Sequence, residues 1–188
     1  MKTYTFTPGG WQQEDFLYAA SATHKYRSTF VQQADCISNE VAEPHPGGEY
    51  ISMMTTEQYG PGTVCEAVCA YEGDAAPLIV FGETPHALEN GALEYGDHLE
   101  AVLYKNGCNV WDIPLVDGRT NVSAVIKARF PVPAGQPVTL RVEFLPKRLR
   151  ITTHGRTIET PCPSLPQQFH VGITACEGVC RFYELRIR

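Results

Sequence analysis

Hydrophobic and polar residues alternate with a period of two along most of the chain, as in β-strands that bury one face. Gly, Pro, Asn and Asp interrupt this alternation at short intervals, and no sustained 3.6-residue period predicts a long helix. The predicted strands are 64–72, 98–104, 122–130, 138–144, 149–154, 169–176 and 181–187. Many short strands at this spacing predict an all-β fold, either an antiparallel sandwich or a barrel.

Two turn signals stand out between these strands. Asn106-Gly107 suits the positive φ angles of a type I′ hairpin turn, and Glu177-Gly178 marks a second tight turn. Residues 38–48 are the best candidate for a long loop. With no repeat and no linker visible, we expect one domain spanning 1–188. An immunoglobulin-like module uses about 100 residues, so a larger jelly roll of two curved sheets fits this length better.

Composition narrows the class of partner. The chain has 188 residues, 43% of them hydrophobic and 19% charged, as in an ordinary globular protein. Its net charge of −6 argues against nucleic acid or an anionic membrane as partner. The dense basic run 147–150 alternates with Leu149 and Ile151, which predicts the solvent face of a strand. The N-terminal residues contain no apolar signal segment, so we expect a cytoplasmic location.

The seven cysteines are interpreted as buried, reduced thiols. Cys65 and Cys69 would lie roughly 13 Å apart on a regular strand, which is too far to share a zinc ion. Cys176 and Cys180 flank a turn, so their spacing leaves open whether they form a disulfide bond.

Candidate chemistry gathers in the hairpin HLEAVLYKNGCNVW, residues 98–111. On a strand His98, Glu100 and Tyr104 share one face, while the opposite face is apolar. On the return strand Asn109 and Trp111 share a face, but the sequence does not fix whether it is the same one. Aromatic rings stack on the C–H faces of sugars, and the polar side chains supply hydrogen bonds to hydroxyls. The hairpin therefore predicts a ligand-binding surface, although Trp111 and Tyr104 could equally be sheet packing.

A hydrolase would need a second carboxyl group close to Glu100. Glycosidases place two carboxyl groups roughly 5–10 Å apart, and no predicted strand carries such a pair at i and i+2. Glu66 on a neighbouring strand is the candidate partner, and His170 is a further weak candidate for the site.

Oxygen donors in the region 35–43 suggest a possible calcium site. Asp35, Asn39, Glu40 and Glu43 cluster there, but without the regular spacing of a calcium-binding loop. We therefore expect no cofactor and no metal ion, with calcium as the open exception.

Three stretches of the chain resemble the concanavalin A-like lectin/glucanase superfamily, including laminin-G-like domains and uncharacterised bacterial proteins of that fold. They are YGDHLEAVLYKNGCNVWDIP, VTLRVEFLPKRLRITTHGRTI and FHVGITACEGVCRFYELRIR. The resemblance implies a jelly roll of two curved antiparallel sheets with a concave carbohydrate-binding face. The Glu-x-Asp-x-Glu motif of the glucanase members is absent, and so is a clear match to the calcium loops of the lectins.

The sequence therefore predicts a carbohydrate-binding, lectin-like domain that is non-catalytic. The expected ligand-binding residues are His98, Glu100, Tyr104, Asn109, Trp111, Glu66 and His170. A glycoside hydrolase or lyase acting on oligosaccharides and a protein-interaction module remain the two alternatives.

Overall fold

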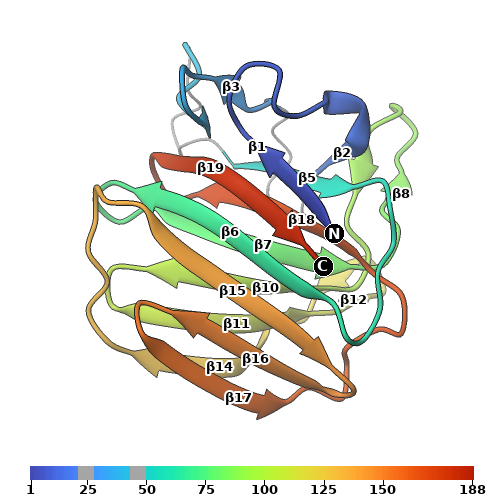
Figure 1. The fold of residues 1–188 in the computed structure, drawn as a ribbon. Helices are drawn as coiled ribbons and strands as arrows, with labels where there is room; N and C mark the ends of the chain where they lie inside the picture. The colour runs from blue at the N-terminus through green and yellow to red at the C-terminus, as the bar shows by residue number, and fades with distance from the viewer. Residues whose placement is uncertain (21–27, 43–49) are drawn as a thin grey trace.

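The computed structural model describes residues 1–20, 28–42 and 50–188, whose strands form two packed sheets (Figure 1). The front sheet has the order β17-β16-β15-β6-β19-β4-β3, with β1 also paired to β19. Its strands are β1 (Lys2–Thr5), β3 (Val31–Gln32), β4 (Ile37–Ser38), β6 (Val64–Tyr71), β15 (Val138–Leu145), β16 (Arg148–Thr153), β17 (Arg156–Pro161) and β19 (Cys180–Ile187).

The back sheet has the order β14-β11-β10-β7-β18-β5-β2-β9-β8. Its strands are β2 (Phe16–Ala20), β5 (Ile51–Thr55), β7 (Ala76–Gly82), β8 (His86–Ala87), β9 (Leu93–Glu94), β10 (His98–Tyr104), β11 (Gly107–Ile113), β14 (Ser123–Arg129) and β18 (His170–Cys176). A separate hairpin joins β12 (Leu115–Val116) to β13 (Arg119–Thr120), and a short 3-10 helix, η1, spans Gln13–Asp15.

The hydrophobic core lies between the two sheets, where the inward residues of the alternating strands meet. Phe81 of the back sheet contacts Phe144 of the front sheet at 4.7 Å between ring centroids, and Phe144 in turn contacts Phe169 at 4.6 Å. Leu99 and Leu103 are buried on this side of β10, as the alternation predicted. The prediction of an all-β jelly-roll sandwich is confirmed.

All seven predicted strands are present, each within one residue of its predicted ends. The prediction missed β7, which lies at the centre of the back sheet. Every residue of β7 is buried, because Ile79 and Phe81 face the core while Leu78 and Val80 pack in a second apolar cluster on the outer face. A strand covered on both faces carries no polar residues at every second position, so it lacks the alternation that identified the others.

The turn that joins β10 to β11 differs from the prediction. Tyr104 pairs with Gly107, so the turn residues are Lys105 and Asn106, and of residues 105–107 Gly107 has a positive φ, of 141°. The type I′ assignment is therefore wrong here. Two consecutive positive φ angles occur instead at Asp117-Gly118, at His154-Gly155 and at the predicted turn Glu177-Gly178.

The outer face of the front sheet is covered by ion pairs between neighbouring strands. Arg141 contacts Glu66 at 2.7 Å and Glu143 at 3.2 Å, and Arg150 contacts Glu159 at 2.8 Å. Lys147 lies in the turn before β16, and Arg148 and Arg150 lie on the solvent side of that strand while Leu149 is buried, which confirms that prediction.

The seven cysteines are free thiols, and all except Cys176 are buried. Cys65 and Cys69 lie in the core on one regular strand, and six of the seven cysteines are buried as the sequence predicted. Among the residues that the structure describes, none forms a helix with the length and apolarity that crossing a membrane requires.

Replacing Gly107 with alanine should destabilise the protein strongly. A Cβ atom there would collide with the Ala128 carbonyl oxygen on β14, and its φ is one that L-residues rarely adopt. We expect G107A to lower the free energy of unfolding by about 3 kcal/mol in urea titrations. Gly118 has a positive φ but open space around it, so G118A should cost about 1 kcal/mol. Equal losses for the two variants would contradict a steric role for Gly107.

Candidate functional site

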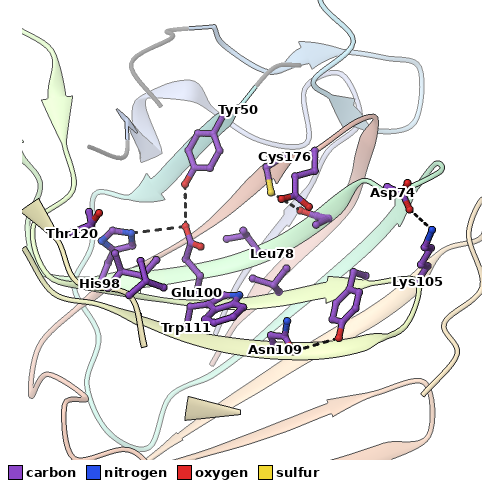
Figure 2. Close-up of a pocket in the computed structure, with 16 residues that line it drawn as sticks. Tyr50, Asp74, Leu78, His98, Glu100, Lys105, Asn109, Trp111, Thr120 and Cys176 are labelled. Carbon is purple, nitrogen blue, oxygen red and sulfur yellow. Dashed lines mark hydrogen bonds and ion pairs between the residues drawn. The ribbon is translucent and has the colours of Figure 1, made fainter. Parts of the chain in front are cut away.

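A cavity of about 430 Å³ opens on the outer face of the back sheet, over β7, β10 and β11 (Figure 2). Its floor is apolar, formed by Leu78 and Val102 of the second cluster, and its walls carry polar and aromatic side chains. Thr120 of the β12–β13 hairpin and the nearby Val122 line one part of the cavity, and Asp74 and Lys105 line another.

The register between β10 and β11 brings five of the predicted residues into this cavity. Glu100 pairs with Trp111 and Val102 pairs with Asn109, so the side chains of both strands share the outer face. His98, Glu100, Tyr104, Asn109 and Trp111 all line the cavity. The sequence left this register open, and the two-residue turn at 105–106 determines it. That these residues bind a ligand stays a prediction.

Glu100 lies at the centre of the site with 13% of its side chain exposed. The Tyr50 hydroxyl donates a hydrogen bond to its Oε1 atom at 3.0 Å, and His98 Nε2 lies 3.8 Å from the same oxygen. In Figure 2 the Tyr50 and His98 side chains both point toward the Glu100 carboxyl group.

Burial raises the pKa of Glu100 from 4.5 to about 7. The Tyr50 hydrogen bond acts in the opposite direction, and the negative charge of Glu177 adds to the increase. Near neutral pH the protonated and ionised forms of this carboxyl group are therefore both populated.

His98 is held by backbone and ring contacts. Its Nδ1 atom lies 2.8 Å from the Gly96 carbonyl oxygen, and its ring lies 4.8 Å from the Tyr95 ring. Burial lowers its pKa, so the imidazole is neutral at neutral pH. The Tyr95 hydroxyl contacts Ser52, whose hydroxyl also contacts Thr174, which continues the polar contacts into neighbouring strands.

The aromatic rings of Trp111 and Tyr104 are contacted by two cations from the edge strand β14, and Tyr104 also contacts the Asn109 side chain. Lys127 Nζ lies 5.3 Å from the Trp111 ring centroid, and the Arg129 guanidinium lies 5.6 Å from that of Tyr104. The Tyr104 hydroxyl donates a long hydrogen bond of 3.4 Å to Asn109 Oδ1. Such contacts orient both rings before any ligand arrives.

The structure contradicts the placement of Glu66 beside Glu100. Glu66 is on β6 of the front sheet, where it pairs with Arg141 on the solvent side. Alternation on the two strands indicated which faces were polar, but not that the two faces belong to different sheets. A carboxyl pair formed by Glu66 and Glu100 is therefore wrong.

His170 lies in the back sheet but outside the cavity lining. Its Nδ1 atom contacts the Thr55 carbonyl oxygen at 2.8 Å, and its Nε2 atom contacts Thr84 Oγ1 at 3.1 Å. These contacts indicate a structural role that ties β18 to its neighbours, and they separate His170 from the predicted site.

Sequence reasoning missed Tyr50 and Glu177, which both line the cavity. Tyr50 directly precedes β5, a strand buried throughout, and no local pattern placed it near Glu100. Glu177 was identified only as a turn residue. Its position at the end of β18, two strands from β10 in the back sheet, could not be read from its neighbours.

The described residues contain no group of three or more His, Cys, Asp or Glu side chains that could hold a metal ion. Asn39 holds the turn before β19 through Gly178 and Cys180, and Glu40 pairs with Arg181. Glu43, the other acidic residue proposed for calcium at the end of that region, lies outside the described residues, as does most of the proposed loop at 38–48. A calcium site there stays untested.

Glu100 should make the protein less stable as the pH rises. Its folded pKa is above its unfolded value, so folding is favoured by protonation, and that contribution is lost between about pH 4.5 and 7. The shift corresponds to about 3 kcal/mol. We expect E100Q to remove most of this loss in denaturant titrations at pH 4.5 and 7.5. An unchanged difference between the two pH values would show that Glu100 is not the group responsible.

Comparison with known proteins gives matches at the level of structure. No family model and no curated protein matches the chain. The carbohydrate-binding module CBM66 from Bacillus subtilis aligns with a TM-score of 0.65 at 10% identity, over 86% of this chain and 92% of that one. A Bacillus subtilis protein of unknown function with a galectin-like fold aligns with a TM-score of 0.68 at 8% identity, over 100% of this chain and 94% of that one.

An enzyme of the same architecture is equally similar. The glycoside hydrolase family 16 endo-glucanase from Bacteroides ovatus aligns with a TM-score of 0.68 at 9% identity, over 100% of this chain and 99% of that one. Identities this low establish shared architecture only. The chain shares with these proteins the fold that the sequence predicted, a jelly roll of two packed antiparallel sheets.

Proposed function

We propose that this protein binds a carbohydrate in the cavity on the outer face of the back sheet. The observation that carries the proposal is the position of Trp111 directly across from Glu100, with Asn109 and His98 in the same cavity. An indole ring offers an apolar surface to a sugar ring, while the neighbouring polar atoms can hydrogen-bond its hydroxyl groups. Clefts with aromatic walls and a few convergent polar groups are typical ligand sites.

The similar structures support this proposal without determining the ligand. They include a module described as carbohydrate-binding, a protein with a galectin-like fold and a glucanase. The protein-interaction alternative receives less support. The large hydrophobic side chains exposed among the described residues are Met1, Val116 and Val122, which do not make an extended apolar patch.

Replacing Trp111 with alanine should weaken carbohydrate binding at least tenfold. The substitution removes the stacking surface, and an aromatic anchor of this kind contributes roughly 1.4–3 kcal/mol to binding. A glycan array would identify ligands, and isothermal titration calorimetry would compare W111A with the unchanged protein. Y183A, on the front sheet and outside the cavity, is the matched control. Equal loss in both variants, or an array with no positive glycan, would contradict the proposal.

Glycoside hydrolysis is the second candidate, because Glu177 provides another carboxylate in the same cavity. Glu100, whose pKa is about 7, could protonate the glycosidic oxygen while Glu177 activates a water molecule. Glu100 and Glu177 line one cavity, whereas Glu66 lies on the other sheet.

The two candidates differ in what happens to a bound oligosaccharide. Hydrolysis would release reducing ends, and either E100Q or E177Q would lower that rate at least a hundredfold. The binding proposal predicts an intact oligosaccharide after prolonged incubation. Chromatography of the reducing ends distinguishes them, and turnover that persists in both variants would exclude this carboxyl pair.

A further inference from the structure

When Glu100 is ionised, two hydrogen-bond acceptors, its carboxylate and His98 Nε2, lie near each other at the cavity. The Gly96 carbonyl can only accept a hydrogen bond, so the neutral His98 ring carries its proton on Nδ1 and leaves Nε2 as an acceptor. His98 is 3% exposed, and its Nε2 atom has no hydrogen-bond partner among the described residues. The distance of 3.8 Å to Glu100 Oε1 is too long for a direct hydrogen bond.

No basic side chain in the described structure neutralises the Glu100 carboxylate. The titratable groups around it are Tyr50, Tyr95, His98, Cys176 and Glu177, which are neutral or acidic at neutral pH. The basic group that lines the cavity, Lys105, and the two cations beside its aromatic rings have other partners. Lys105 pairs with Asp74, while Lys127 and Arg129 lie over aromatic rings.

We propose that the preferred ligand is a carbohydrate bearing a free primary amino group, whose ammonium bridges Glu100 and His98 Nε2 while its ring stacks on Trp111. This inference rests on the proposed function and specifies its ligand class. The ammonium supplies the positive charge that the described neighbours of Glu100 lack.

The number of donor hydrogens distinguishes this ligand from a neutral sugar. A single hydroxyl group donates one hydrogen bond, so a neutral sugar needs two neighbouring hydroxyl groups to satisfy Glu100 and His98 Nε2, and these bring no positive charge. An N-acetyl amide also donates one, and it adds bulk and a carbonyl acceptor. A primary ammonium donates three hydrogen bonds and accepts none, which matches two adjacent acceptors beside a buried carboxylate.

Binding should be coupled to proton release. The carboxyl group of the free protein has a pKa of about 7, and a bound ammonium favours its ionised form. Near pH 7 complex formation therefore releases a fraction of a proton from Glu100. Affinity should rise from pH 6 toward neutral pH as the carboxyl group ionises, and it should fall again at more alkaline pH as the amine of the ligand loses its proton.

The test uses matched trisaccharides that share one backbone and differ at one position. They carry free amino, N-acetylamino or hydroxyl groups, in both α- and β-linked series, and cadaverine serves as an amine without a sugar ring. Titration calorimetry at pH 7, in two buffers of different ionisation enthalpy, measures both affinity and proton release. We expect the amino trisaccharide of one series to bind at least tenfold more tightly than its neutral counterparts and than cadaverine.

Glu100→Gln should remove this preference and the proton release, because it keeps the shape of the side chain and removes its charge. Glu14→Gln, an exposed carboxylate in η1, is the matched control and should change neither. Neutral trisaccharides that bind as tightly as the amino form would overturn the inference and leave the proposed function intact. Cadaverine binding as tightly as the amino sugar would also overturn it. Absence of binding by every oligosaccharide would contradict the proposed function itself.

Discussion

Strand β7 must bury apolar side chains on both faces of its sheet, and this constraint connects the core to the cavity. On the inner face Phe81 packs against the front sheet, and on the outer face Leu78 forms part of the cavity floor. The second apolar cluster places buried apolar side chains in the middle of the outer face. Glu100 pairs with Val80 on the neighbouring strand, so its carboxyl group lies beside this apolar surface and its pKa rises.

A glutamate side chain has opposite electrostatic surroundings on the two sheets. Glu66 lies on a solvent-exposed face and is paired with Arg141, and a surface ion pair of this kind contributes up to about 1 kcal/mol. Glu100 is surrounded by neutral groups and a second acid, which costs stability once it ionises. Carboxyl groups held at such a cost are typical of functional sites, because their charge and proton are then available to a ligand.

Alternation along the chain was sufficient to predict seven strands and the fold class, and it placed His98, Glu100 and Tyr104 on one face. That Asn109 and Trp111 share this face follows from the register of the hairpin, which alternation does not determine. Alternation failed at β7, which has no polar side chains to alternate with, and at β5, whose polar residues Ser52 and Thr55 are three positions apart and buried. It also failed at Glu66, because a periodic pattern identifies the face of a strand and not the sheet to which the strand belongs. Tyr50 and Glu177 reach Glu100 through the order of strands in the back sheet, which depends on long-range pairing.

The seven free thiols affect the reversibility of folding. Burial raises the pKa of Cys36 to about 11 and those of Cys108 and Cys180 to about 12, so they form almost no thiolate in the folded protein. The unfolded chain exposes all seven sulfur atoms with pKa values near 8.5, where oxygen can oxidise and cross-link them. Heating in air should therefore trap the chain in mixed disulfides, whereas a reductant should let the same sample refold.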